Sequence, residues 1–410
     1  MQQTERLKAY AHTLLTTGVH LKKGGTLVVS TDVEQKDFAT IVTREAYALG
    51  AAEVVINWRA HEIAKERLLH ASDDVLSQPA PWIPTYYKTY VDKGAVFLSL
   101  ISANPYAMQG VEPNRIALQS RHLNKVLDFY HEAIMGSAVR WCVAAVATPL
   151  WADLLGFTGT DEEKTDTLWE RIFTLCRIEN VTPEEAIDAH LARLAKRTAS
   201  MNTLNFASLH YTCPNGTDLT ITLPEGHIWQ GGSELDKYGT EFDANIPTEE
   251  VFSVPQYDGV NGIVYSTKPL IYQGNRIEHF HLTFKDGKVV DYDAEVGKDY
   301  LTILLETDEG AHYLGELALV DHYSPISQSD TIYYETLFDE NASCHLALGA
   351  AYPTCLKDSD GLSKDELKVR GLNQSLTHVD FMIGHEQMKI VGTTHDGHQV
   401  TVMENGRLQL

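Results

Sequence analysis

The two halves of this 410-residue chain have different sequence patterns, and this difference limits the folds that the chain can adopt. In the first half, apolar runs of strand length alternate with amphipathic segments of helix length. Such alternation is typical of a parallel sheet covered by helices. Strand patterns lie at 22–32, 51–58, 93–105 and 140–149, and helical patterns lie at 34–50 and 160–205. We therefore predict an α/β domain with a parallel sheet over residues 1–205.

After residue 205 the pattern changes to short alternating runs separated by hairpin-turn dipeptides. These dipeptides are Asn215-Gly216, Asp286-Gly287, Asp396-Gly397 and Asn405-Gly406. Asn-Gly and Asp-Gly favour the positive φ angles of tight hairpin turns. Their density predicts an antiparallel, β-rich second domain over residues 206–410.

Charge and cysteine content limit the partners and the compartment. The formal net charge is −23, whereas nucleic acids and acidic membranes bind basic surfaces. We therefore expect neither as a partner, and favour small molecules, cations or peptides. Five scattered cysteines, no export signal and no membrane-spanning apolar run predict a cytoplasmic protein with reduced thiols. Neither a G-x-G-x-x-G nor a Walker A sequence supports nucleotide binding.

The stretch LTHVDFMIG, residues 376–384, sets two polar residues into an apolar strand pattern. Side chains alternate along a strand, so His378 and Asp380 point to one side and Val379 and Phe381 to the other. A half-exposed edge strand would explain this pattern, since short motifs often arise by chance. The alternative is that an imidazole and a carboxylate face a cation together.

Further candidate ligands lie in three other short stretches of the second half. They are Glu249 and Glu250 in NIPTEEVFSVP, Glu316 in YLGELALV, and Glu340 and His345 in FDENASCHLALGAAYP, which also contains Tyr352. An ionised carboxylate such as Glu316 in an apolar strand is costly unless it is paired or binds a metal. A salt-bridged Glu316, a core His345 and a core Tyr352 remain alternatives. We expect Cys344 to face the opposite side of its strand from His345 and to pack.

Taken together, the candidates contain carboxylates and imidazoles but no thiolates. Such a set suits Zn²⁺, Co²⁺ or Mn²⁺ in a hydrolytic site rather than a structural zinc site. Three glutamates, one aspartate and two histidines suffice for two metals that share a bridging carboxylate. We therefore expect two divalent cations per subunit.

The segments NIPTEEVF, LGELALV, FDENASCHLALG and HVDFMIG resemble the signature segments of the aminopeptidase T, aminopeptidase S and PepS family of metallo-aminopeptidases. The similarity extends over the whole chain. It implies a barrel-like catalytic domain, a homodimer with enclosed active sites, and release of N-terminal residues from peptides. It matches the family's active-site tyrosine to Tyr352. The metal ligands that it implies are Glu250, Glu316, Glu340, His345, His378 and Asp380.

The chemistry of the residues agrees with this resemblance. Two divalent cations that share a water can lower its pKa and supply hydroxide near neutrality. We expect Tyr352 to hydrogen-bond the tetrahedral oxyanion and Glu316 to bridge the metals. Glu249 is a candidate for the proton relay to the leaving amine. On a regular strand, however, Glu249 would face away from Glu250, so the pair must lie in a loop or bulge to serve this purpose.

Two other functions fit the same ligands. A dinuclear hydrolase of another ester or amide, such as a phosphoesterase, would need basic residues near the ligands, and the nearest in sequence are Lys357 and Lys364. A non-catalytic metal-binding or peptide-binding protein would need neither the tyrosine nor a general base. Metal-dependent cleavage of an unblocked dipeptide, but not of its N-acetylated form, separates the three functions.

Overall fold

The structure is a computed structural model that describes residues 3–178 and 183–410. The chain folds into two compact units, each built from several stretches of sequence. Unit 1 comprises residues 1–107, 126–193 and 232–248, and unit 2 comprises 108–125, 194–231 and 249–410. Residue 205 thus lies inside unit 2, and the division between the units falls within helix α10 (Pro183–Leu204).

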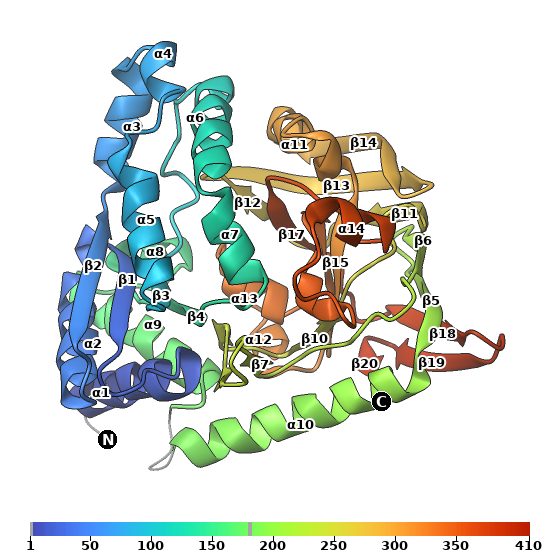
Figure 1. Ribbon diagram of the computed structural model, residues 1–410, viewed down its shortest axis with the longest axis horizontal. Coiled ribbons are helices and arrows are strands. Elements are labelled where there is room, and N and C mark those ends of the chain that lie inside the picture. The colour runs from blue at the N-terminus through green and yellow to red at the C-terminus, as the bar shows by residue number, and fades with distance from the viewer. Residues whose placement is uncertain (1–2, 179–182) are drawn as a thin grey trace. The chain divides into compact units, whose positions relative to one another are not determined.

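Unit 1 contains the parallel sheet that the first half predicts (Figure 1). Within the described residues this sheet has five strands in the order β2-β1-β3-β4-β9, all paired in parallel. The strands are β1 (Thr26–Asp32), β2 (Glu53–Arg59), β3 (Val96–Ile101), β4 (Trp141–Ala145) and β9 (Asn245–Ile246). The first four confirm the strand patterns. The fifth is a two-residue strand from the second half of the chain, where we expected only the β-rich domain.

Helices pack on this sheet and around it. Val28 and Phe97 form an apolar cluster with tyrosines of α5 and α7, which cover one face. Helix α2 confirms the helical pattern at 34–50 and packs against β1 and β2. The helices of unit 1 are α1 (Gln3–Thr13), α2 (Lys36–Ala48), α3 (His61–His70), α4 (Asp73–Leu76), α5 (Trp82–Asp92), α7 (Asp128–Met135), α8 (Pro149–Leu154) and α9 (Asp161–Leu175). The short strands β7 (Glu234–Leu235) and β8 (Glu241–Phe242) pair with each other.

Unit 2 is rich in antiparallel strands, as the hairpin dipeptides predict. One region follows the pairing order β12-β13-β11-β6-β5-β18-β19-β20, with β14 paired to β13. Its strands are β5 (Phe206–Thr212), β6 (Asp218–Thr222), β11 (Val260–Tyr265), β12 (Leu270–Tyr272), β13 (Asn275–Lys285), β14 (Lys288–Val296), β18 (Lys389–Thr394), β19 (Gln399–Glu404) and β20 (Arg407–Leu408). The four dipeptides lie at the β5–β6, β13–β14, β18–β19 and β19–β20 turns. Asp286 and Asn405 have φ angles of 47° and 51°, the left-handed conformation that these tight turns need.

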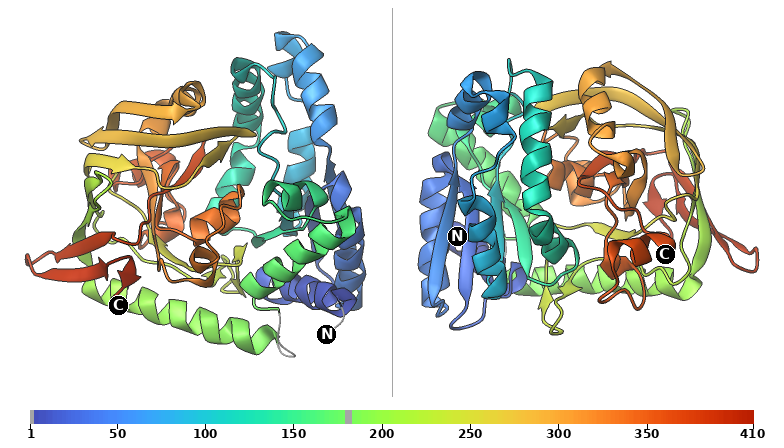
Figure 2. Two further views of the ribbon diagram at one scale, coloured as in Figure 1. Left: turned by 180° about the vertical axis from the view of Figure 1, so that it is seen from behind. Right: turned by 45° about the horizontal axis from the view of Figure 1, so that its top comes forward.

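A second, four-stranded sheet in unit 2 has the order β10-β15-β16-β17. It consists of β10 (Glu250–Ser253), β15 (Leu314–Val320), β16 (His345–Gly349) and β17 (His378–Met382), all antiparallel. The helices of unit 2 are α6 (Pro113–Val126), α11 (Lys298–Leu305), α12 (Pro325–Gln328), α13 (Thr336–Asn341) and α14 (Lys364–Val369). Helix α11 packs against the β13–β14 hairpin, drawn in gold in Figure 2.

Apolar packing joins the two antiparallel regions of unit 2 into one large core. All five cysteines are buried and none forms a disulfide, and Cys344 packs in this core, as its position before β16 predicts. Among the described residues we find no helix with the length and apolar character needed to cross a bilayer.

Candidate metal centre

The register of the four-stranded sheet places four of the predicted ligands on one face. Glu316 in β15 lies opposite Ala347 in β16, and Ala347 lies opposite Asp380 in β17. Residues directly opposite each other in an antiparallel pair share a face. His345 and Gly349 are two residues either side of Ala347 and therefore point to the same side. Because Gly349 lies opposite His378, that imidazole joins the same face.

Small residues separate these long side chains, while the other face of the sheet is apolar. Ala347, with a single methyl group, lies between the carboxylates of Glu316 and Asp380 and leaves room for them to approach each other. The opposite face contributes Leu317, Leu319, Leu346, Leu348 and Phe381 to the core of unit 2. Burial of these side chains fixes the register, because a slip of one residue would exchange the two faces. The predicted alternation in residues 376–384 is confirmed.

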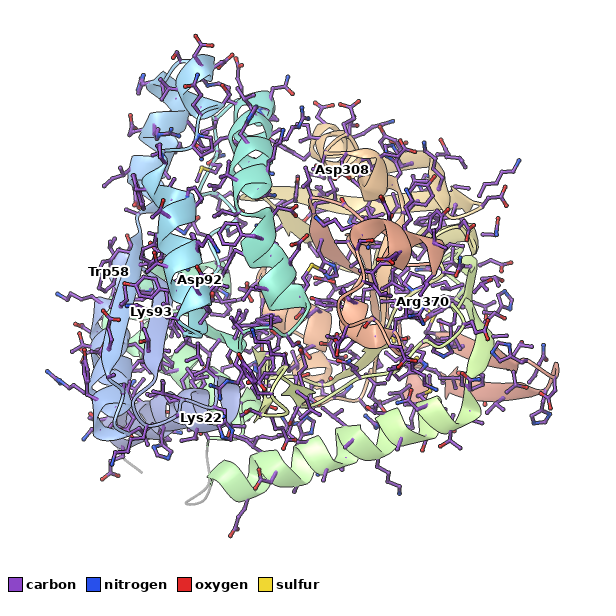
Figure 3. All side chains as sticks on the ribbon, in the orientation of Figure 1. Lys22, Trp58, Asp92, Lys93, Asp308 and Arg370 are labelled. Atoms are coloured by element: carbon purple, nitrogen blue, oxygen red, sulfur yellow. The ribbon has the colours of Figure 1, made fainter. Side chains whose placement is uncertain are left out.

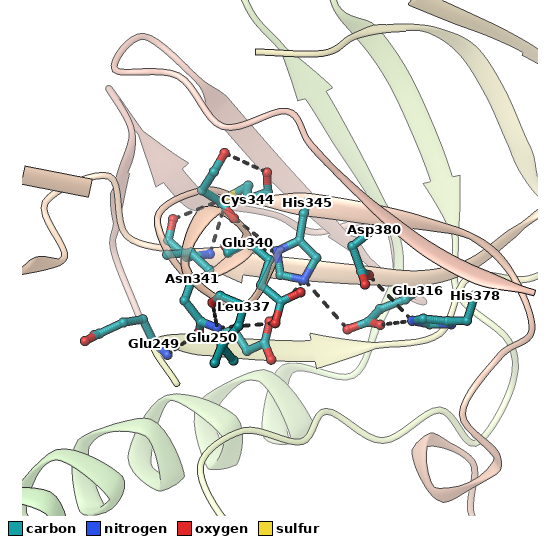
Figure 4. A network of polar contacts seen from close by, with 12 residues as sticks. Glu249, Glu250, Glu316, Leu337, Glu340, Asn341, Cys344, His345, His378 and Asp380 are labelled. Carbon is teal, nitrogen blue, oxygen red and sulfur yellow. Dashed lines mark hydrogen bonds and ion pairs between the residues drawn. The ribbon is translucent and has the colours of Figure 1, made fainter. Parts of the chain in front are cut away.

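The remaining two predicted ligands lie next to this face (Figure 4). Glu250 begins β10, and its Oε2 lies 3.0 Å from Nε2 of His345. Glu340 comes from α13, where it precedes the fully buried Asn341. Asn341 donates to the Leu337 carbonyl at 2.8 Å and accepts from the Glu249 backbone N–H at 2.6 Å. Asn341 thus ties the ligand helix to the start of β10, a role that we did not predict.

The donor atoms of these six residues form three overlapping groups. The groups are Glu250, Glu316 and His345; Glu316, His378 and Asp380; and Glu340, His345 and Asp380. Within each group the donor atoms lie within 4.8 Å of one another. Nε2 of His378 is 3.0 Å from Glu316 and 3.5 Å from Asp380. The structure therefore brings all six predicted ligands together.

Both imidazoles are oriented as metal ligands usually are. Nδ1 of His378 lies 2.7 Å from the Ala350 carbonyl, and Nδ1 of His345 lies 3.1 Å from the Ser343 carbonyl. A carbonyl only accepts, so Nδ1 carries a proton and Nε2 is the ring nitrogen directed at the carboxylates. Among the described residues, Nε2 of His378 and Oδ1 of Asp380 have close neighbours but no hydrogen bond of normal geometry. A cation between these atoms would satisfy both.

The segment that leads into β17 is also fixed by hydrogen bonds. Asp308, labelled in Figure 3, accepts from the Leu376 backbone N–H at 2.6 Å and from the Ser375 hydroxyl at 2.7 Å. It also accepts from the Ala311 N–H at 2.9 Å. These contacts hold the chain just before His378.

Burial and crowding shift the pKa values of the centre. Burial raises the pKa of Glu316 to about 7, and it raises the pKa of Glu340 well above the usual range. Burial alone would lower the pKa of the two imidazoles, but Glu250 beside His345 and Asp380 beside His378 raise both pKa values well above normal. These shifts are those of a buried cluster with excess negative charge.

The donor set fits two divalent cations by charge as well as by chemistry. Four carboxylates carry −4 in total, and protonation of both imidazoles would leave −4 + 2 = −2 in a buried site. Two divalent cations with neutral imidazoles give −4 + 4 = 0. Buried charges are stable only when they are compensated. Oxygen and imidazole donors without thiolate suit Zn²⁺, Co²⁺ or Mn²⁺.

Tyr352 lies beside the centre, but Glu249 does not face it. The Tyr352 ring packs edge-on against the His378 ring with centroids 4.9 Å apart, and against Phe252 at 5.6 Å. Glu249 directly precedes β10 and is buried. In Figure 4 its carboxylate points away from the ligand cluster, the direction that strand alternation from Glu250 predicts.

Comparison with known proteins agrees with this centre. The family model described as thermophilic metalloprotease (M29) matches residues 3–408. The chain belongs to the M29 metalloprotease family. It is 42% identical to aminopeptidase AmpS of Bacillus subtilis over 403 residues, 98% of each chain. It is 35% identical to aminopeptidase T of Thermus aquaticus over 405 residues, again 98% of each chain.

A solved structure has the same fold. The chain matches wild-type AmpT from Thermus thermophilus with a TM-score of 0.89 and 33% sequence identity. The match covers 99% of this chain and all of that one. The family resemblance predicted from the short signature segments is therefore confirmed over the whole length.

Proposed function

We propose that this M29 protein is a metal-dependent aminopeptidase that removes N-terminal residues from peptides. The observation that supports the proposal is the sheet face on which four carboxylates and two imidazoles converge. The family is one of metalloproteases, and the relatives named above are aminopeptidases. Peptides with a free N-terminus are therefore the proposed substrates.

Two cations per subunit suit the donors better than one. Each imidazole has a single lone pair available at Nε2, so His345 and His378 can each bind only one cation. Carboxylates can bridge, and Glu316 belongs to one donor group with His345 and to another with His378. We therefore assign Glu316 as the bridging ligand, with Asp380 as the second carboxylate shared between groups. Zn²⁺, Co²⁺ and Mn²⁺ all suit this set.

Bound divalent cations would lower the pKa of a water molecule. They would also offer positive charge to the scissile carbonyl oxygen and to the substrate's α-amine. The residues of the chain orient this chemistry. The backbone carbonyls behind His345 and His378 fix the imidazole tautomers, and the sheet register fixes the distance between Glu316 and Asp380. Such pre-set geometry lowers the reorganisation needed in the transition state.

Tyr352 is the proposed donor to the oxyanion, because its ring lies against the ligand His378. Glu249 remains a proposal for the proton relay to the leaving amine. That role requires its side chain to turn from the direction seen in Figure 4 toward the ligand face.

Several finer predictions accompany this function as proposals. They are a catalytic domain over 206–410 with barrel-like closure, an α/β domain over 1–205, a homodimer with enclosed active sites, and a cytoplasmic location. Each follows from the family resemblance or from sequence patterns. A dinuclear hydrolase of another ester and a non-catalytic metal-binding protein remain the alternatives to be tested.

Release of alanine from Ala-Ala and from N-acetyl-Ala-Ala tests the proposal. An aminopeptidase cleaves the first, leaves the second intact, and stops after chelation. Glu309→Gln is a matched control in unit 2, because Glu309 is 68% exposed and pairs with Lys288 at the surface. Cleavage of the acetylated peptide at an equal rate, or turnover without metal, would contradict the proposal.

A further inference from the structure

The parallel sheet of unit 1 has a topological switch point between β1 and β3. From β1 the chain passes through α2 to β2 on one side of β1, and then returns to β3 on the other side. In open α/β sheets, ligands bind in the crevice at the carboxyl ends of the strands at such a point. This position belongs wholly to unit 1, whereas all six metal-ligand candidates belong to unit 2.

A pocket of about 280 Å³ lies at this switch point. Its lining includes Asp32 at the end of β1, Glu34 and Gln35 in the turn that follows, Ser102 just after β3 and Thr148 after β4. This volume lies just below the usual range for ligand pockets, about 300–1,000 Å³. It suits a molecule of about amino-acid size and is too small for a dinucleotide.

One buried side chain in the lining is left with an unused donor. Gln35 is 2% exposed, and its Oε1 accepts from the Thr31 hydroxyl at 2.6 Å and from the Asp32 backbone N–H at 3.3 Å. An N–H needs an acceptor, so the amide cannot be flipped and Nε2 is the remaining donor. Among the described residues, Nε2 of Gln35 has no hydrogen-bond partner. Buried donors are rarely left in this state, so an acceptor on a ligand or a water molecule in the pocket is expected here.

The charges of the lining select the kind of ligand. Asp32, the buried carboxylate, is paired with Arg59 at 2.9 Å and with His61 at 3.4 Å. Glu34 and Glu62 also line the pocket, and both are exposed at its rim. None of the described residues lining the pocket is a lysine or an arginine. His61 also lines the pocket, but its imidazole is already paired with Asp32, so a phosphate group would find no free basic partner, whereas an ammonium group would find two carboxylates.

We propose that this pocket binds a free α-amino acid, whose carboxylate accepts from Gln35 and whose ammonium group faces Glu34 and Glu62. The hydroxyls of Ser102 and Thr148 in the same lining hydrogen-bond each other at 2.7 Å, which leaves one of the two O–H groups as a further donor to the carboxylate. The ligand thus has its acceptor toward the buried end of the pocket and its positive charge toward the acidic rim. The proposal rests on the lining alone and does not depend on the peptidase function.

Equilibrium dialysis of labelled alanine against the full-length, metal-loaded protein tests this site. Gln35→Glu keeps both acceptor contacts of Oε1 but replaces the Nε2 donor with a negative oxygen. We expect it to weaken alanine binding about tenfold or more, the usual loss for a hydrogen bond to a charged group. Glu62→Gln, at an exposed position where folding is not at risk, should weaken it about two- to fivefold.

Glu66→Gln is the matched control, one turn along α3, where Glu66 is 67% exposed, pairs with His70 and does not line the pocket. It should bind alanine like the unaltered protein. Glu316→Gln, which alters the metal centre, should also retain alanine binding. Loss of binding in Glu316→Gln would assign the alanine to the metal centre and overturn the proposal, as would unchanged affinity in both Gln35→Glu and Glu62→Gln.

Blocked analogues test the class of ligand. N-acetylalanine lacks the ammonium group and alaninamide lacks the carboxylate, so neither should compete with labelled alanine at tenfold excess. Competition by either analogue at equal strength, or by ribose or inorganic phosphate, would overturn the assignment to a free amino acid.

Discussion

The parallel sheet of unit 1 and the four-stranded antiparallel sheet of unit 2 place their polar side chains differently. In β1 the middle residues Leu27, Val28 and Val29 are buried and apolar, and the first pocket-lining residue is Asp32, at the strand end. In β15 a carboxylate, Glu316, lies in mid-strand at 4% exposure. Both strands are buried, yet only the second has an ionisable group in its centre.

The difference shows what makes a buried carboxylate tolerable in a sheet. In the antiparallel sheet, the register places an aspartate two strands away and histidines on the same face, so several donors can share cations. The parallel strands offer no such set, and their polar groups gather where the strands end. The comparison predicts that disruption of the antiparallel face, or of Tyr352 beside it, removes function, whereas changes in the apolar cores alter mainly stability.

The largest expected effect comes from Glu316→Gln. The amide keeps the volume of the side chain but is a poor ligand for two cations. We expect peptide hydrolysis to fall by more than the roughly 10²–10³-fold that follows loss of one oxyanion donor. Rates on Ala-Ala and circular dichroism of the same preparation would check this. A near-normal rate in a folded variant would make Glu316 structural.

Tyr352→Phe separates catalysis from metal binding. If the hydroxyl stabilises charge that develops in the transition state, kcat should fall about 10²–10³-fold with little change in KM. Metal content should stay the same, because a phenol is not needed beside four carboxylates and two imidazoles. Tyr292→Phe is the control, because it removes a tyrosine hydroxyl that donates a hydrogen bond to Thr302 and is not one of the residues placed at the metal centre. A normal kcat with a lowered melting temperature would remove Tyr352 from the mechanism.

Two neighbouring positions in β16 test the two faces directly. Leu346→Ala removes a fully buried side chain from the apolar face and should cost about 2–5 kcal/mol of stability while metal content is kept. Ala347→Leu adds bulk between Glu316 and Asp380 and should lower metal content. Unfolding midpoints and metal analysis of both variants would check this. Equal loss of metal in the two variants would remove the distinction between the faces.

A buried carboxylate in unit 1 gives the smallest expected effect. Burial raises the pKa of Asp243 to about 7, above its unfolded value, so the folded state loses stability as pH rises from about 4 to about 7. Asp243→Asn should therefore gain about 1–3 kcal/mol at pH 8, and little at pH 4. Melting temperatures at the two pH values measure this. A gain of the same size at pH 4 would show that charge burial is not its cause.

The parts of the fold that have strong local signals could be predicted from the sequence. The Asn-Gly and Asp-Gly dipeptides locate four hairpins correctly, and apolar runs locate β1 to β4. Membership of the units could not be predicted in this way. Strand β9 consists of two residues, Asn245 and Ile246, and pairs with β4, which lies about 100 residues earlier in the chain. Two residues are too few to show a periodic sequence pattern. Helix α6 lies largely in unit 2 although it comes from the first half of the chain, and its local sequence pattern does not indicate this membership.

Local alternation and burial singled out some of the candidate ligands, because both act over a few residues, whereas the family resemblance implied the full set. His378 and Asp380 had to share a face, and Glu316 had to find a partner. The contacts that position them were not predictable. The link from Asn341 to Glu249, and the carbonyl of Ala350 behind His378, depend on segments that meet only in the folded chain.

Metal content measured together with activity tests the central claim, that one face of β10-β15-β16-β17 holds two divalent cations needed for peptide hydrolysis. The purified protein should contain about two divalent cations per chain. Exhaustive chelation should abolish cleavage of Ala-Ala, and added Zn²⁺, Co²⁺ or Mn²⁺ should restore it as the second equivalent binds. Full turnover by a thoroughly metal-free preparation, or metal that stays bound in Glu316→Gln at unchanged stoichiometry and activity, would contradict the claim.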